Sequence, residues 1–322
     1  MGVDLRDIVK PKVIEISELR NKLIAIDAFN VIYQFLSALR QSDGTSLKDS
    51  HNNITSHLSG LFYRTIKLMK FGIKPIYVFD GKPVDLKFKT LEKRSIAKEA
   101  AKEKWSKAID EGNLENARKF AKRTSTLTGE MVAESKNLLN AMGIPCIRAI
   151  NDGEALCAYI CKKGDVYAVA TQDYDALLFG APKTLRNLTF TGDIKLEALN
   201  LADVLKNLGI TREQLIDIGI LVGTDFNNGV KGIGPKTALK IVKSGKFPTE
   251  KFNFDVDEIR KIFTNPNVTD RYNIEFKDYD EDEIFKILCD EHDFSRERVK
   301  NGLNELRKTK EESRQKGLNV WF

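Results

Sequence analysis

Four aspartates of this sequence follow short apolar runs of the kind that form buried strands. They are Asp27 after residues 23–26, Asp80 after residues 76–79, and Asp173 with Asp175 after residues 166–170. Parallel strands have their carboxyl ends at one edge of a sheet, where open α/β folds bind their ligands. We therefore expect these carboxylates to converge, and three further acids to join them. These are Asp152 and Glu154 at the start of a predicted helix, and Asp225 after an apolar helix.

Carboxylates that lie this close together repel one another, which raises their pKa values unless positive charge compensates them. The sequence has only three histidines, and four cysteines without a C-x-x-C pair, so neither a zinc site nor a disulfide framework is expected. An all-oxygen ligand set selects hard ions such as Mg²⁺ or Mn²⁺. Two such ions would activate a water and stabilise both oxygens of an in-line phosphoryl displacement.

Each acid also has an ordinary structural interpretation. Asp152 directly precedes a predicted helix that starts at Gly153, where aspartate is a common cap, and Asp173 or Asp175 can form a turn. The coincidence of acids at three strand ends favours metal binding over these separate roles.

A glycine-rich segment, residues 229–239, connects two predicted helices. Gly232 and Gly234 permit a tight turn and the close approach of a phosphate, while Lys231 and Lys236 supply positive charge. The pattern is typical of a helix–hairpin–helix motif, whose amides, with a monovalent cation, would hold DNA phosphates without reading bases. An ordinary turn between two helices is the alternative.

The elements that must position these residues alternate between strands and helices. Strands are predicted at 22–27, 75–80, 144–147 and 166–171, and helices at 30–39, 54–71, 129–142 and 153–162. This order predicts an α/β fold with a central, mostly parallel twisted sheet flanked by helices. The later sequence is mainly helical, with predicted helices at 201–208, 212–222, 236–243, 255–263, 281–289 and 296–314.

One stretch accounts for the net charge of +6 that the 322 residues carry. Residues 82–128 hold 13 Lys or Arg against 7 Asp or Glu. They are rich in helix formers and poor in large apolar residues, which is ordinarily typical of a solvated helical insertion. The insertion begins directly after Asp80, however, at the sheet edge where ligands bind.

Composition excludes several classes of protein. A hydrophobic content of 42% rules out overall disorder. No apolar run is long enough to span a membrane, and the first ten residues, with Asp4, Arg6 and Asp7, do not resemble a secretory signal. We therefore expect an intracellular, cytoplasmic protein that does not bind membranes.

The sequence resembles the flap endonucleases, a family of structure-specific 5′ nucleases, most closely the archaeal type. The similarity extends from Met1 to Phe322, and five segments carry it. They are Ile24-Ala-Ile-Asp27-Ala, Tyr77-Val-Phe-Asp80-Gly-Lys-Pro, Ala168-Val-Ala-Thr-Gln-Asp173-Tyr-Asp175, Gly223-Thr-Asp225 and Gly232-Ile-Gly-Pro-Lys236. The resemblance implies a PIN-like fold and a Mg²⁺-dependent phosphodiesterase that removes 5′ flaps in replication, where it matures Okazaki fragments, and in repair. It also implies an associated 5′–3′ exonuclease activity.

The resemblance divides the acids into two metal groups. One group corresponds to Asp27, Asp80, Asp152 and Glu154, and the other to Asp173, Asp175 and Asp225. The family most often has Glu at the position of Asp152, and the shorter side chain here favours Glu154 as the direct ligand. Mn²⁺ can substitute for Mg²⁺ in this interpretation.

The resemblance also assigns residues that contact DNA. Residues 82–128 correspond to a helical arch that the flap passes through. Lys87 and Arg94, which act in catalysis with Asp80, match two basic residues that reach the scissile phosphate, and their spacing places them on one helix face. Tyr33 matches an aromatic residue that stacks on the base next to the cut, although its helical pattern also fits core packing. Gly2 would bring the chain end near the DNA.

The last eight residues resemble a peptide that binds sliding clamps, Q-x-x-L-x-x-aromatic-aromatic. Leu318, Trp321 and Phe322 would form an apolar plug, and Gln315 would enter a polar pocket. The expected partners are branched DNA with a 5′ flap and a PCNA-type sliding clamp, and the chain is expected to be a monomer, associated with the nucleoid if it is archaeal.

The expected organisation has five parts. They are a nuclease part at 1–81, the arch at 82–128, a second nuclease part at 129–260 that contains the hairpin motif at 215–243, a helical region at 261–307 and a tail at 308–322. A non-catalytic DNA-binding clamp accessory is the alternative outside enzymes, and the intact acid set argues against it. Resolving, excision-repair or exonucleolytic relatives usually carry a longer arch or tail.

Overall fold

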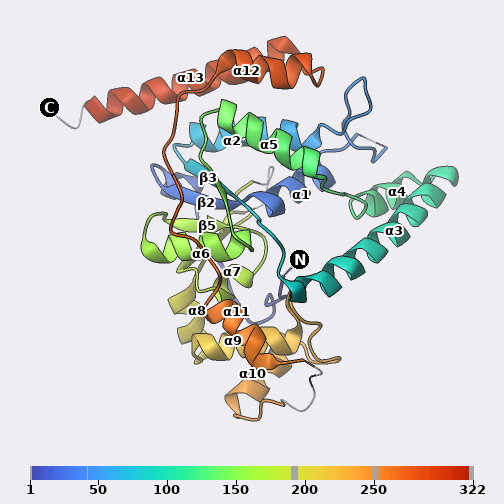
Figure 1. Ribbon diagram of the computed structural model, residues 1–322, viewed down its shortest axis with the longest axis vertical. Coiled ribbons are helices and arrows are strands. Elements are labelled where there is room, and N and C mark those ends of the chain that lie inside the picture. The colour runs from blue at the N-terminus through green and yellow to red at the C-terminus, as the bar shows by residue number, and fades with distance from the viewer. Residues whose placement is uncertain (1, 42, 190–194, 249–251, 253, 319–322) are drawn as a thin grey trace.

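The centre of the protein is a seven-stranded sheet with the order β1-β7-β6-β5-β2-β3-β4 (Figure 1). The strands are β1 (Lys12–Val13), β2 (Leu23–Asp27), β3 (Lys74–Phe79), β4 (Cys146–Arg148), β5 (Ala168–Ala170), β6 (Lys183–Arg186) and β7 (Glu197–Asn200). Five neighbouring strands, in the spatial order β6-β5-β2-β3-β4, are parallel, whereas β7 and β1 are antiparallel to their neighbours. The prediction of a mostly parallel sheet is therefore confirmed.

The structure is a computed structural model. It describes residues 2–41, 43–189, 195–248, 252 and 254–318, without the side chains of 85, 88, 89, 91, 93, 94, 114 and 309–318. Within this part of the chain, no helix is both long and apolar enough to cross a membrane.

Helices cover both faces of the sheet because the buried strands are apolar on both sides. Ile24 and Ile26 of β2 belong to one core, and Ala25 between them belongs to the other. The first core includes α1 (Ala28–Ala38), α2 (Ser56–Lys70), α5 (Gly129–Ala141), α12 (Glu281–Phe285), the π-helical segment η4 (Lys286–Asp290) and α13 (Arg296–Leu318). The second includes α6 (Gly153–Lys163), α7 (Asp175–Leu178), α8 (Leu201–Leu208), α9 (Arg212–Val222), α10 (Pro235–Lys243) and α11 (Val256–Thr264).

Two helices project from the body between β3 and α5 (Figure 1). A short turn of 3-10 helix, η2 (Asp85–Lys87), leads into α3 (Phe88–Asp110), and α4 (Leu114–Ala121) returns beside it. Their buried apolar residues in the described part of the chain are alanines: Ala101, Ala108, Ala117 and Ala121. These small side chains let the two helices pack closely without a core of their own, as the composition of residues 82–128 predicts.

The predicted helices and strands of the body agree with the structure to within about two residues, which is the usual uncertainty of element ends. The sequence does not predict β1, β6 and β7. Predicted helix 281–289 divides into α12 and η4. The last helix, α13, packs on the body through Val299, Leu303 and Leu306, and its C-terminal end extends past the body (Figure 1).

Candidate active site

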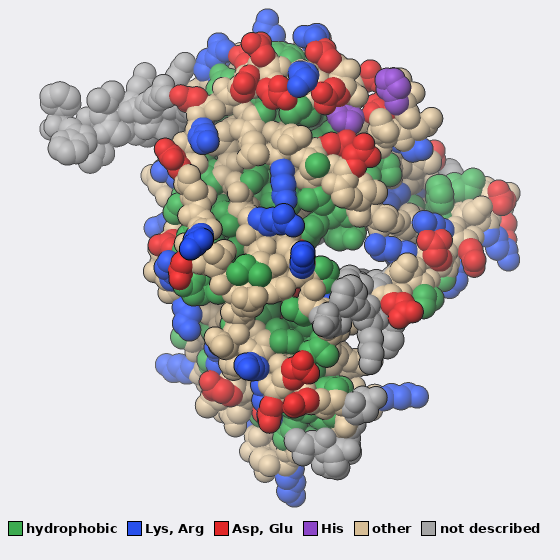
Figure 2. Space-filling model, in the orientation of Figure 1, with side chains coloured by type: hydrophobic (Ala, Val, Ile, Leu, Met, Phe, Trp, Pro, Cys, Tyr) green, Lys and Arg blue, Asp and Glu red, His purple; other side chains and the backbone are tan. Residues whose placement is uncertain are grey.

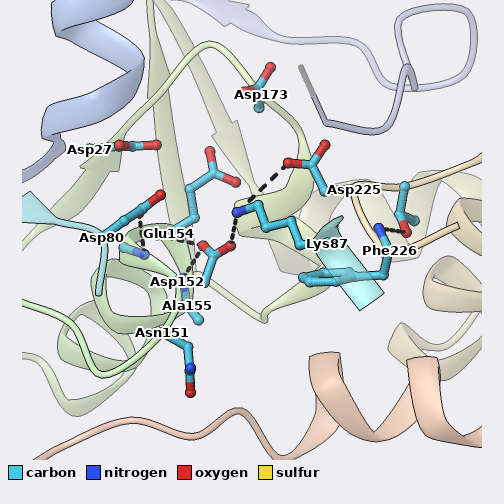
Figure 3. A network of polar contacts seen from close by, with 12 residues as sticks. Asp27, Asp80, Lys87, Asn151, Asp152, Glu154, Ala155, Asp173, Asp225 and Phe226 are labelled. Carbon is cyan, nitrogen blue, oxygen red and sulfur yellow. Dashed lines mark hydrogen bonds and ion pairs between the residues drawn. The ribbon is translucent and has the colours of Figure 1, made fainter. Parts of the chain in front are cut away.

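Six of the seven predicted acids line one cavity of about 1440 Å³, at the carboxyl edge of the parallel strands (Figure 3). They are Asp27, Asp80, Asp152, Glu154, Asp173 and Asp225. Asp27 ends β2 and caps α1, accepting a hydrogen bond from the Asn30 N–H at 3.2 Å. Asp80 follows β3 and accepts from the Gly153 N–H at 2.8 Å. Their convergence at the strand ends is as predicted.

The start of α6 contributes two acids. The Asp152 Oδ1 atom accepts hydrogen bonds from the backbone N–H groups of Glu154 at 3.0 Å and Ala155 at 3.4 Å. Asp152 is therefore a helix cap, as its ordinary interpretation predicts, and it also lies in the cluster. Glu154 is buried and accepts a hydrogen bond from the Thr171 hydroxyl, which fixes its carboxylate toward the cavity.

The seventh acid, Asp175, is not among the residues that line the cavity. It begins α7, is buried, and accepts a hydrogen bond from the Val3 N–H at 2.7 Å. Gly2 passes so close that a Cβ atom on it would lie 2.3 Å from the Asp175 Oδ2 atom. A side chain at position 2 would therefore clash with Asp175, and glycine there lets the N-terminal segment pack against the acids. The expectation that Gly2 brings the chain end near the DNA stays a prediction.

A lysine from the base of the arch enters the acidic cluster. The Lys87 Nζ atom donates a hydrogen bond to the Asp152 Oδ2 atom at 2.6 Å and lies 3.8 Å from the Asp225 Oδ2 atom (Figure 3). Only 14% of the Lys87 side chain is exposed. Burial alone would lower the pKa of Lys87, but the charges of Asp152 and Asp80 outweigh it and raise that pKa. The ammonium group therefore stays charged and offsets part of the repulsion between the acids.

Burial and mutual repulsion shift the carboxyl groups toward their neutral form. Burial, followed by the charge of Asp152, raises the pKa of Asp80 to about 6, with Lys87 acting in the opposite direction. Burial, followed by the charges of Asp225 and Asp173, raises the pKa of Asp175 to about 8. The pKa values of Asp27 and Glu154 are also well above their ordinary range, first because of burial and then because of neighbouring carboxylates.

These shifts predict how the stability of the protein depends on pH when metals are chelated. A carboxyl group with a raised folded-state pKa stabilises the fold below its ordinary pKa, and this contribution is lost as the pH rises through the folded-state pKa. The free energy of unfolding in EDTA should therefore fall as the pH rises above about 4. The contribution of Asp80 should be lost as the pH passes about 6, and that of Asp175 as it passes about 8. Urea unfolding across this range measures the decrease.

Asp175→Asn is the matched control for this titration, because the amide keeps the shape of the side chain without ionising. It should flatten the upper part of the pH dependence, and saturating Mg²⁺ should oppose the decrease in the wild type. A free energy of unfolding that rises with pH in EDTA would contradict the assignment of these shifts.

The cavity has a basic wall on the arch. Figure 2 shows an opening between the arch and the body, with Lys and Arg side chains on the arch. Tyr33 of α1 lines the cavity with 39% of its surface exposed, and the Lys98 Nζ atom of α3 lies 5.0 Å from its ring centroid. Tyr33 is therefore not a core residue. Arg94 lies in α3, but its side chain is outside the described residues, so its predicted role stays a prediction.

The predicted hairpin joins α9 to α10 at the end of the molecule away from α13 (Figure 1). Gly232 has a positive φ of 84°, and Gly234 is the N-cap residue of α10, followed by Pro235 at its first turn. A Cβ on either glycine would meet no atom within 4 Å, so the backbone there is open to a ligand. Lys231 and Lys236 are both exposed beside it.

The predicted clamp peptide, residues 315–322, lies partly outside the described residues. Gln315 and Leu318 lie in α13 with undescribed side chains, and Trp321 and Phe322 are outside the described residues.

Sequence patterns did not identify Asn30, whose Nδ2 atom donates to the Asp173 Oδ2 atom at 3.0 Å. Its spacing could have revealed it, since Asn30 lies three residues after Asp27 and three before Tyr33 on α1.

Among the described residues, no group of three His, Cys, Asp or Glu side chains is arranged to hold a metal ion. The donor chemistry nevertheless fits a hard divalent cation, because all the converging donors are carboxylate oxygens. The one thiol beside them is Cys157, whose pKa is raised well above its ordinary value by burial and then by Asp27. In the protein without metal this thiol is therefore protonated.

Comparisons with known proteins agree along the whole chain. Residues 1–101 match the XPG N-terminal domain, and residues 143–225 match the XPG I-region. Flap endonuclease 1 of Pyrococcus furiosus is 53% identical over 100% of this chain and 99% of its own length, and that of Methanobrevibacter smithii is 47% identical over 100% of both. The solved flap endonuclease-1 from Methanococcus jannaschii is 45% identical, covers 96% of this chain and 98% of its own, and superposes with a TM-score of 0.81. The catalytic core of Rad2 in complex with DNA substrate is 26% identical, covers 94% and 97%, and has a TM-score of 0.70.

Proposed function

This chain belongs to the flap endonuclease family and is a structure-specific 5′ flap nuclease, and we propose that its acidic cluster uses two Mg²⁺ ions to hydrolyse DNA. The observation that carries the proposal is the convergence of carboxylates from separate strand ends beneath a basic arch. Asp27, Asp80, Asp152 and Glu154 would hold one ion, and Asp173, Asp175 and Asp225 the other. When bound, the ions supply an activated water and neutralise charge on the attacking and leaving oxygens.

Hydrogen bonds within the site orient its acids, and two basic residues would act on the phosphate. Glu154 and Asp173 are oriented by Thr171 and Asn30, which restrict where their oxygens can lie. Asp152 uses one oxygen to cap α6 and the other to hold Lys87. A scissile phosphate that enters the cavity would draw the Lys87 ammonium toward its developing charge. Arg94, seven residues further along α3, would approach the same phosphate.

The function is tested most directly with one 5′-flap substrate labelled at its 5′ end, incubated with Mg²⁺. A structure-specific endonuclease releases the flap as one product of nearly uniform length, cut near the junction. Release of the label as a mononucleotide, without a longer flap product, would contradict the proposal. We also propose an associated 5′–3′ exonuclease activity.

We further propose that the hairpin holds the duplex next to the junction. Its open backbone amides, together with a monovalent cation, would bind the phosphates of the DNA. Rad2, bound to DNA in its solved complex, supports this class of substrate. Tyr33, exposed in the cavity, would stack on the base next to the cut.

The hairpin lysines should contribute affinity rather than rate. Lys231→Ala and Lys236→Ala should each weaken flap binding and reduce the slope of log K against log salt by about one, because each removes one phosphate contact. Fluorescence anisotropy across a salt series measures this slope. Lys206→Ala, which changes an exposed lysine of α8, is the matched control. An unchanged slope in both hairpin variants would remove the hairpin from the DNA path.

We also propose that residues 315–322 bind a PCNA-type sliding clamp and place the enzyme in replication, at Okazaki fragment maturation, and in repair. The match of Gln315, Leu318, Trp321 and Phe322 to the clamp-binding pattern supports this. Deleting these residues should abolish co-elution with a clamp and leave cleavage of free flap DNA intact. Co-elution of the truncated protein would refute the assignment.

A further inference from the structure

One arginine outside the acidic cluster contacts both residues that flank Asp173. Arg186, at the end of β6, donates a hydrogen bond from Nε to the Gln172 carbonyl oxygen at 3.3 Å. Its Nη1 atom donates to the Tyr174 hydroxyl at 2.8 Å, and its guanidinium carbon lies 4.5 Å from the centroid of that ring. Tyr174 is 4% exposed and separates Asp173 from Asp175 in the sequence. One side chain thus holds the backbone of the residue before Asp173 and the side chain of the residue after it.

Arg186 is itself fixed to the sheet. Its Nη1 atom forms an ion pair with the Glu197 Oε2 atom at 3.0 Å, and only 16% of the arginine side chain is exposed. Arg186 and Glu197 are register partners on the antiparallel strands β6 and β7. The planar guanidinium therefore connects a rigid strand pair to the 172–175 loop through several donors at once, which a single ammonium group cannot do.

The other side of the same loop is held by α1. The Asn30 Oδ1 atom accepts from the Gln172 N–H at 3.2 Å, and its Nδ2 atom donates to Asp173. Residue 172 is thus held at its N–H by α1 and at its carbonyl by Arg186. This two-sided support opposes the mutual repulsion that would otherwise separate the carboxylates of Asp173 and Asp175.

We propose that Arg186 is a positioning residue for the carboxylate pair of Asp173 and Asp175, and that it sets the affinity of this pair for a divalent cation. The inference rests on the proposed metal-dependent function and extends it to a residue that contacts neither carboxylate. Groups that orient ligands from outside typically change metal affinity by about 10- to 100-fold when they are replaced. The competing interpretation is that Arg186 only joins β6 to β7 through Glu197.

The test compares Arg186→Lys with Glu197→Gln. Arg186→Lys keeps a cation opposite Glu197 but removes the fork that reaches both sides of Asp173, whereas Glu197→Gln removes the charge of the cross-strand pair and leaves the arginine. Calorimetric titration of each DNA-free protein with Mn²⁺ measures binding directly. We expect Arg186→Lys to weaken the binding by about tenfold and to raise the Mg²⁺ concentration for half-maximal flap cleavage by a similar factor. Cleavage at saturating Mg²⁺ should largely recover.

Tyr174→Phe gives a second measurement if Arg186→Lys folds poorly. It removes only the hydroxyl that Arg186 contacts, and should shift the Mn²⁺ affinity in the same direction by a smaller factor. Equal Mn²⁺ affinity in the wild type, Arg186→Lys and Tyr174→Phe would overturn the inference, as would an equal shift in Glu197→Gln and Arg186→Lys. A wild type that neither binds Mn²⁺ nor requires Mg²⁺ would instead overturn the proposed metal-dependent function, and the inference with it.

Discussion

Asp173→Ala should lower the rate of flap cleavage at saturating Mg²⁺ by about a thousandfold or more, because losing a metal ligand removes several kcal/mol of transition-state stabilisation. Asp173 lies in the cavity with its carboxylate oriented by Asn30. Alanine removes both oxygens, so no added Mg²⁺ should restore the rate. Single-turnover cleavage of a labelled flap measures the loss.

Binding of the flap should survive this substitution. The proposed phosphate contacts at Lys231 and Lys236 are distant in sequence and untouched, and removing a negative charge reduces the repulsion of DNA. Anisotropy in EDTA should therefore give a dissociation constant equal to or tighter than that of the wild type. Asp203→Ala is the matched control, since Asp203 is exposed on α8. Equal cutting by the wild type and Asp173→Ala would refute the metal assignment.

Lys87→Ala should slow cleavage by about 10²- to 10³-fold at saturating DNA, with little change in affinity. The ammonium group is almost buried between Asp152 and Asp225, so it cannot act as a general surface contact for DNA. Its charge matters when the phosphate gains charge in the transition state. For binding, losing a single phosphate contact changes the slope of log K against log salt by only about one.

Lys82→Ala separates this effect from a general loss of positive charge, because Lys82 is exposed a few residues before Lys87. It should cut at nearly the wild-type rate. Single-turnover rates and dissociation constants for both variants decide between the roles. Parallel losses of rate and affinity in Lys87→Ala would indicate that the lysine merely binds DNA.

The strand ends that carry Asp27 and Asp80 could be predicted because β2 and β3 are buried on both faces and read as continuous apolar runs. Strands β6 and β7 could not be predicted in this way. Each is four residues long and carries polar or charged residues at both ends, as in Lys183–Arg186. Their pairing with the sheet, rather than their local composition, makes them strands, and the role of Arg186 was hidden for the same reason.

Contacts between distant segments set the other limit of prediction. The spacing of Lys87 and Arg94 indicates a shared helix face, but only the folded chain shows the Lys87 ammonium against Asp152. Likewise His57 and His292 lie far apart in the sequence, yet both contact Glu134, at 2.8 Å and 3.5 Å. Local sequence patterns indicate residues of the right type at strand ends. Contacts between segments that are distant in the sequence depend instead on how the layers of the fold pack.

The seven acids come from segments that begin at the end of β2 and finish beyond α9, and Gly2 must also reach Asp175. During synthesis, a ribosome therefore delivers the last of these acids only after most of the chain has emerged. A nascent chain that has folded its first strands holds fewer than half of the carboxylates. A chain that ends before Asp225 therefore lacks part of the proposed metal-binding set, so the site depends on long-range folding rather than on any one local segment.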